Sequence, residues 1–147
     1  MAAARAVGDI LLGFDFGTRR IGVALGSRRL AGARALAALE YQDGPDWDAI
    51  AQLIEDWQPT ALVVGLPLTL EGRPQPVTRA AQTFMRELER RFGLPVHGAD
   101  ERMSSLEAQS QLRTQRASGL RRRRVRDADV DSTAAKLILE HWLSEHP

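Results

Sequence analysis

The stretch that decides the fold is ILLGFDFGTRRIGVAL, at residues 10–25. Its first seven residues are almost wholly apolar, and a second apolar run covers residues 21–25. Two short apolar runs on either side of a glycine-containing turn predict a pair of antiparallel strands. Asp15 interrupts the first run close to the turn, and strand alternation places it on the same face as Leu11 and Gly13.

The next elements outward follow from hydrophobic spacing. Residues 30–39 predict a third strand, although their alanine content leaves a helix as the alternative. Helical spacing after the N-cap residue Asp46 predicts a helix that Pro59 closes. The valine-rich run at 60–66 predicts a strand buried on both faces, and a long amphipathic helix should cover residues 77–92.

The C-terminal part continues the alternation of strands and helices. Residues 95–99 predict a brief strand, and the capping box of Ser104 and Glu107 predicts a helix to about residue 115. Residues 116–126 should be irregular, and a last helix is expected over 130–143. This order predicts one α/β domain over residues 1–147, with antiparallel strands first, crossover units afterwards and residues 1–8 as a flexible tail.

The composition excludes several classes of protein. The chain has 147 residues and no cysteine, which rules out disulfide scaffolds, thiolate metal sites and cysteine nucleophiles. Its 20 basic residues include a single lysine, Lys136, so neither a Walker phosphate loop nor a protein kinase can be built. No stretch approaches the ~18 apolar residues of a membrane span. We therefore expect a cytoplasmic protein without a membrane partner.

Three acidic positions lie at the boundaries of predicted elements. Asp15 is near the end of the first strand, Glu101 follows the strand at 95–99, and Asp131 heads the last helix. Each has an ordinary structural explanation: turn hydrogen bonds for Asp15, capping or charge pairing beside Asp100, and helix-dipole stabilisation at residues 127–131. Taken together, they predict a site with oxygen ligands only.

Such a site prefers magnesium or manganese. His97, His141 and His146 lack the spacing of a zinc site, and no serine-hydrolase elbow is present. Asp100, Asp127 and Asp129 are reserve candidates for the same metal site. Metal-assisted phosphoryl chemistry is therefore the activity that the residues favour.

The arginines predict a polyanionic partner. Residues 113–126 contain seven arginines and no acid, and although such a run can also be a solvated loop, its density favours contact with phosphates. Arg19, Arg20 and Arg102 neighbour the acidic positions and could bind the scissile phosphate or compensate the acids. The seven arginines are Arg113, Arg116, Arg121, Arg122, Arg123, Arg124 and Arg126.

Four motifs in this order resemble the RuvX (also called YqgF) family of Holliday-junction resolvases. They are DFGTRRIGVAL at 15–25, VVGLPLTLEG at 63–72, DERMSS at 100–105 and DSTAAKLIL at 131–139. The resemblance covers nearly the whole chain and implies a three-layer ribonuclease H-like fold with a mixed five-stranded sheet. The residues after GLPL and the arginine-rich loop depart modestly from the family pattern.

The resemblance implies an endonuclease in which Asp15, Glu101 and Asp131 hold two Mg²⁺ or Mn²⁺ ions for phosphodiester hydrolysis. The family suggests two substrates, Holliday junctions in DNA or the precursor of 16S ribosomal RNA, and the sequence does not choose between them. A two-fold symmetric junction would require a homodimer, whereas RNA trimming needs one site. The alternatives are a non-catalytic nucleic-acid-binding accessory factor and, less favoured, a nucleotide-binding protein.

Overall fold

A computed structural model of the chain provides the structure. It describes the backbone of residues 127–131 and, with side chains, residues 9–17, 20–30, 32–41, 43–67, 76–100 and 132–146. Every structural statement below refers to these residues.

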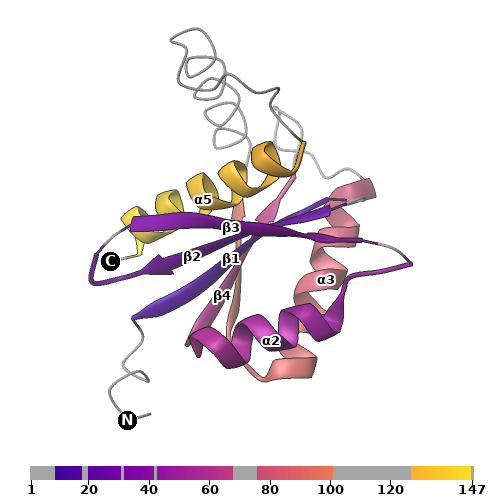
Figure 1. Cartoon of the computed structure of the whole chain (residues 1–147), viewed down its shortest axis with the longest axis horizontal. Coiled ribbons are helices and arrows are strands. Elements are labelled where there is room, and N and C mark those ends of the chain that lie inside the picture. Colours follow the sequence, from indigo (N-terminus) through magenta and orange to yellow (C-terminus); the bar gives the residue numbers. More distant parts are fainter. Residues whose placement is uncertain are drawn as a thin grey trace, which may run out of the picture.

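The described strands form one mixed sheet (Figure 1). Its order is β3-β2-β1-β4-β5, with antiparallel pairing of β1 to β2 and of β2 to β3, and parallel pairing of β1 to β4 and of β4 to β5. The sheet therefore has the predicted arrangement, antiparallel strands first and parallel strands afterwards. The bounds are β1 Ile10–Phe16, β2 Arg20–Ser27, β3 Gly32–Glu40, β4 Ala61–Leu66 and β5 Val96–Asp100.

Helices cover both faces of this sheet, which makes a three-layer structure (Figure 1). Helix α5, Asp127–Glu145, lies on one face, while α2, Trp47–Trp57, and α3, Pro76–Phe92, lie on the other. The N-cap prediction for α2 is confirmed, because an Asp46 carboxylate oxygen accepts a hydrogen bond from the Ala49 amide at 3.1 Å. Helix α3 ends before Gly93, which has a φ of 66°.

The core beneath α2 and α3 is built from large side chains. Phe84 of α3 lies at its centre, with ring centroids 5.7 Å from Phe14, 5.1 Å from Phe16 and 5.6 Å from Trp47. Aromatic rings at these separations contribute both burial and edge or offset contacts. Leu12, Phe14 and Phe16 of β1 therefore point into this core, away from α5.

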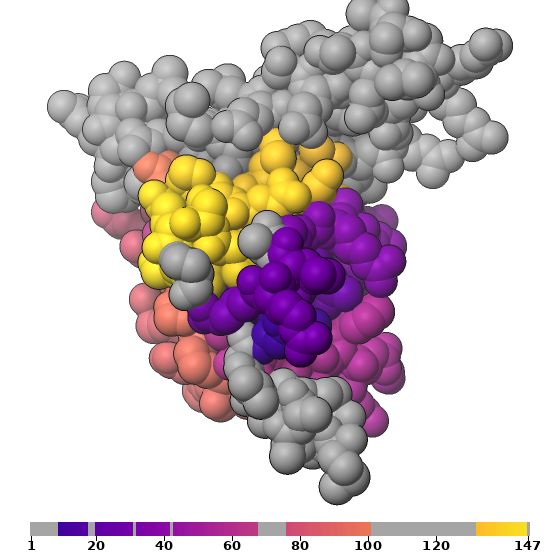
Figure 2. Space-filling model, turned by 90° about the vertical axis from the view of Figure 1, so that its left-hand side faces the viewer, coloured from indigo at the N-terminus to yellow at the C-terminus, as the bar shows by residue number. Residues whose placement is uncertain are grey.

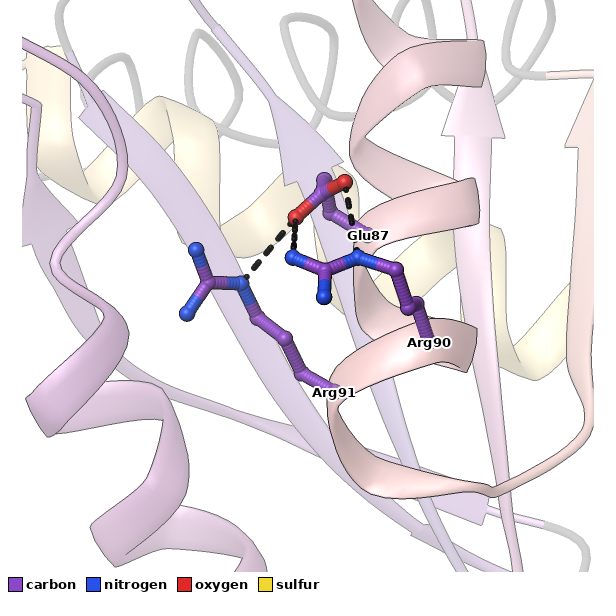
Figure 3. A network of polar contacts seen from close by, with 3 residues as sticks. All are labelled: Glu87, Arg90 and Arg91. Carbon is purple, nitrogen blue, oxygen red and sulfur yellow. Dashed lines mark hydrogen bonds and ion pairs between the residues drawn. The ribbon is translucent and has the colours of Figure 1, made fainter.

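A cation–π contact links α2 to α3 at the surface, and an ion-pair network within α3 lies beside it. The guanidinium of Arg91 lies 4.2 Å from the Trp47 ring, and Figure 3 shows Glu87 accepting hydrogen bonds from both Arg90 and Arg91. The hydrogen bond from Arg90 is the main reason that the pKa of the exposed Glu87 carboxyl lies below its ordinary value. The network is solvated and organises the surface of α3.

The core beneath α5 is built from smaller residues on the sheet. Leu11, Ala24, Ala61, Val63 and Ala99 face the helix and are buried against it. From α5, the side chains that fill this core are Ala135, Ile138, Leu139, Trp142 and Leu143. Short side chains on the sheet let the helix approach closely.

Most predicted elements are confirmed, with two differences. The stretch at 30–39 is strand β3, so the helical alternative was wrong: pairing with β2 overrides the helix propensity of its alanines. Helix α5 begins at Asp127, so the prediction that Asp131 heads it was also wrong, because the helix includes the earlier acidic residues, which favour a first turn.

Some predictions fall on parts that the structure does not describe. The tail at 1–8, the helix at 104–115 and the irregular stretch at 116–126 lie outside the described residues. The extent of the single domain, 1–147, stays a prediction. Within the described part of the chain, no helix combines the length and the apolar character needed to cross a bilayer.

Candidate active site

Asp15 is a partly exposed acid between two buried phenylalanines of β1. Its partner in register on β2 is Gly22, and its partner on β4 is Gly65. Directly opposite residues in neighbouring strands normally bring their Cβ atoms to about 4.5–5.5 Å, so a pair of glycines removes both side chains that would crowd the carboxylate. Neither neighbouring strand therefore places a side chain directly opposite Asp15.

Asp15 lies on the face of the sheet that α5 covers. Leu11 on this face is packed in the α5 core, and a Cβ on Gly13 would lie 3.1 Å from the Cβ of Leu139. Strand alternation continues this face to Asp15. The sequence-based placement of Asp15 with Leu11 and Gly13 is therefore confirmed.

The direction of α5 brings its N-terminal half toward Asp15. Leu143 lies over Gly26, which pairs with Leu11, whereas Leu139 reaches Gly13 further along β1. The helix thus runs antiparallel to β1, and Ala135 lies one turn closer to the strand's carboxyl end. Asp131 precedes Ala135 by one further turn, and its backbone therefore belongs to the same end of the sheet as Asp15.

Strand β5 ends at Asp100, the first of the two neighbouring acids in the sequence. Ala99 is buried against α5, whereas Val96 packs in the core under α3. Alternation then assigns Asp100, which pairs with Leu66, to the α3 face, away from the face of Asp15. This placement weakens Asp100 as a reserve candidate, and Glu101, the next residue, lies outside the described part of the chain.

Ser132 is a candidate that the sequence analysis did not single out. It is 5% exposed, and its Oγ has no hydrogen-bond partner among the residues that the structure describes. It precedes Ala135 by three residues, on the buried side of α5 at the level of the candidate site. The available signal was a polar residue directly after Asp131 inside an otherwise apolar helical face.

Arg20 is the described member of the predicted phosphate-binding arginines. It begins β2, and its Nε lies 3.8 Å from a carboxylate oxygen of Glu40 on β3. The hairpin joins it closely to Asp15, since the Gly17 amide donates to the Arg20 carbonyl at 3.0 Å. The structure does not describe Arg19, Glu101, Arg102, the arginines of 113–126, or the side chains of Asp127, Asp129 and Asp131.

Asp15 and Ser132 are thus the site's described oxygen donors, from a strand and a helix. Within the described ranges, no three His, Cys, Asp or Glu side chains gather as a metal-binding group. Oxygen ligands suit hard cations such as Mg²⁺. A buried hydroxyl without a hydrogen-bond partner suits a hydrogen bond to a water molecule or another ligand of such a cation. The described donors therefore fit a hard divalent cation, but do not complete its ligand set.

Comparisons with known proteins identify the family of the chain. The RuvX family pattern, described as Holliday junction resolvase, matches residues 9–145. A protein of Azotobacter vinelandii is 48% identical over 140 residues, covering 94% of this chain and 95% of that protein. One from Xylella fastidiosa is 51% identical over 138 residues, covering 92% and 88%. Both carry the name "Putative pre-16S rRNA nuclease".

Solved structures show the same fold at low sequence identity. The RuvC protein of T. thermophilus, in complex with a Holliday junction substrate, aligns with a TM-score of 0.53 at 16% identity, over 93% of this chain and 94% of that chain. The yeast mitochondrial Holliday junction resolvase gives 0.52 at 12% identity, covering 92% and 78%. The family match over residues 9–145 and the relatives that are about half identical over nearly the whole chain show that the chain belongs to the RuvX family, a family of nucleases.

Proposed function

We propose that this chain is a divalent-metal-dependent endonuclease that hydrolyses a phosphodiester bond beside Asp15. The observation that carries the proposal is the position of Asp15 between Gly22 and Gly65, on the face that the N-terminal half of α5 covers. An acid in a partly buried strand is costly unless a cation or hydrogen bonds compensate its charge.

In this proposal, Asp15, Glu101 and Asp131 hold the metal. Support comes from the chemistry of carboxylate oxygens and from the placement of the Asp131 backbone on the end of α5 that approaches Asp15. When bound, two Mg²⁺ or Mn²⁺ ions supply electrostatic stabilisation of the attacking and leaving oxygens. The buried hydroxyl of Ser132 would orient an oxygen ligand at the same place.

The arginines position the phosphate backbone in this proposal. Arg20, held beside Asp15 by the hairpin, would act near the scissile phosphate together with Arg19 and Arg102. The seven arginines of 113–126 would bind flanking phosphates without reading base sequence. Guanidinium groups suit this task because they donate to phosphate oxygens in pairs.

A structured ribosomal RNA precursor is the substrate that we favour. Proteins that are about half identical to this chain are named for pre-16S rRNA, and RNA trimming needs only one site. The proposal includes action in the cytoplasm, where such a precursor occurs. The family description and the junction-bound fold relative keep four-way DNA junctions as the second substrate, for which a homodimer would be required.

The test offers labelled precursor RNA and a labelled four-way junction to the protein, with Mg²⁺, Mn²⁺ or chelator. We expect cleavage of RNA with metal, none with chelator, and loss of cleavage but retained binding for Asp15→Asn. Asp48→Asn, an exposed acid on α2, is the control with the same charge change and should cleave normally. Binding by the wild type without cleavage under any metal would leave the accessory-factor alternative, and symmetric incision of junctions alone would assign DNA.

A further inference from the structure

Three basic side chains gather around Trp142 at the end of α5. The Trp142 ring stacks on His146 at a centroid distance of 4.1 Å and on His97 of β5 at 5.0 Å, and the Arg28 guanidinium lies 5.4 Å from its centroid. Figure 2 shows the face where the yellow end of α5 meets the indigo-to-violet segment after β2. We call Arg28, His97 and His146 the tryptophan-centred basic cluster.

Most donors of this cluster are unused within the described structure. Arg28 donates one hydrogen bond, from Nη1 to the His146 carbonyl at 2.8 Å, and has no acidic partner among the described residues. The Nδ1 of His146 lies 2.9 Å from the Trp142 carbonyl and must be the donor there, which leaves Nε2 facing a ligand. Neither ring nitrogen of His97 has a described hydrogen bond.

Among the described residues, no carboxylate forms a hydrogen bond or an ion pair with the side chains of this cluster. The neighbouring carboxylate of Asp9 accepts from the Ser27 hydroxyl and the Arg29 amide, and Glu145 pairs with His141 at 3.5 Å. Burial lowers the pKa of His97, and the basic groups of His146 and Arg28 lower it further. An anion that approached these three groups would meet the Arg28 guanidinium and would favour protonation of the imidazole of His97.

We propose that the tryptophan-centred basic cluster binds a backbone phosphate of the nucleic-acid substrate, away from the bond that is cut. Phosphate oxygens would accept from the Arg28 guanidinium, from His97 and from Nε2 of His146. Trp142 is 5% exposed, too buried to stack on a base, so it orients the three groups and the contact reads the backbone. This inference rests on the proposed nuclease function.

The position of the cluster fits such a flanking contact. His97 stacks on Trp142 and thus lies on the α5 face, which is also the face of Asp15. Trp142 follows Ala135 by seven residues, or about 10 Å along the helix axis. A strand bound beside Asp15 could therefore reach the cluster within a few nucleotides.

Proton uptake provides a specific signature. A bound phosphate favours a charged imidazole, so binding should raise the pKa of His97 and should tighten as the pH falls from 8 to 6. His141, exposed on the same helix and outside the cluster, is the reference imidazole for this comparison. NMR of the histidine side chains measures all three groups separately.

The experiment uses the full-length Asp15→Asn protein, which prevents cleavage, with a short precursor RNA or with inorganic phosphate alone. Arg28→Gln is compared with Arg29→Gln, the adjacent exposed arginine. Losing one phosphate contact should lower the slope of log affinity against log salt by roughly 0.7 for single-stranded RNA. We expect this loss for Arg28→Gln and for His97→Gln, and none for Arg29→Gln.

Unchanged histidine titrations in RNA-saturated protein would overturn the inference while leaving the proposed nuclease intact, because binding and cleavage are measured separately. Equal salt slopes for the Arg28 and Arg29 variants would do the same. Titration shifts with inorganic phosphate but not with RNA would mean an anion site that the substrate does not use, which also overturns it. A wild-type protein that binds no nucleic acid would refute both proposals.

Discussion

Leu139 of α5 rests directly against Gly13 of β1, with its Cβ 3.1 Å from the place that a Cβ on Gly13 would occupy. This contact fixes how closely the last helix approaches the first strand, two residues before Asp15. Gly26 continues the contact on β2, where a Cβ would lie 2.7 Å from Cδ2 of Leu139 and 3.2 Å from Cδ1 of Leu143. The closeness of α5 to the strand that carries Asp15 therefore depends on Gly13 and Gly26.

Gly26→Ala should destabilise the protein by about 1–3 kcal/mol, because the added methyl overpacks a buried contact. Urea unfolding measures the change. Gly32→Ala is the control, since its nearest contact would be an ordinary 3.7 Å to the Leu30 carbonyl oxygen, and its stability should hardly change. If the overpacking explanation is correct, Leu139→Ala should reduce the cost of Gly26→Ala; an unaltered cost would contradict it.

Divalent metal should stabilise the folded protein through Asp15. A ligand present at 100 times its Kd adds about 2.7 kcal/mol to the unfolding free energy when it binds only the folded state. We expect Mg²⁺ or Mn²⁺ to raise the Tm of the wild type and of Asp48→Asn, and to leave Asp15→Asn unchanged. An equal rise in all three would show that the ion binds elsewhere.

Ser132→Ala should separate stability from activity. Removing a buried hydroxyl without a described partner should leave the metal-free protein equally stable or more stable by up to about 1 kcal/mol. Cleavage should fall if the hydroxyl orients a ligand near Asp15. Ser144→Ala, an exposed hydroxyl that donates to the His141 carbonyl on the same helix, should leave cleavage intact. A strongly destabilised Ser132→Ala would mean that its hydroxyl has a structural partner.

The stability of the nucleic-acid-free protein should decrease in mild acid through His97. The folded-state pKa of His97 lies below its ordinary value of 6.5, so the unfolded chain binds the proton first as the pH falls. The unfolding free energy should therefore decline below about pH 6.5, down to the folded-state pKa. Urea unfolding at several pH values should show a shallower decline for His97→Gln than for His141→Gln. Equal declines would refute this assignment.

The sequence predicted most of the fold because its signals are local. The turn at Gly17, the N-cap Asp46 and the stop at Gly93 each act within one element, and the structure confirms the strands and helices they bound. The alanine-rich stretch of β3 was ambiguous because its strand state depends on pairing with β2, a partner that propensity does not include. The sequence predicts that the last helix begins at residue 130, whereas α5 begins at Asp127, because the sequence has no clear N-cap residue there.

The site was only partly predictable for the same reason. Asp15 stands out locally as an acid in an apolar strand, and its face follows from alternation. The glycines beside it come from the register of three strands, and the stack of His97 on Trp142 joins residues distant in the chain. The assignments of Glu101 and Asp131 as metal ligands stay predictions.

The alternation along β5 has a further consequence for how this protein can evolve. Ala99 and Asp100 point to opposite layers, so a one-residue deletion in the loop before β5 would shift the phase of the strand and reverse which neighbouring position looks toward α5. Asp100 would then change environment while the backbone path of the strand survived. The length of the loop before β5 therefore decides whether an acid at the end of this strand looks toward α5 or toward α3.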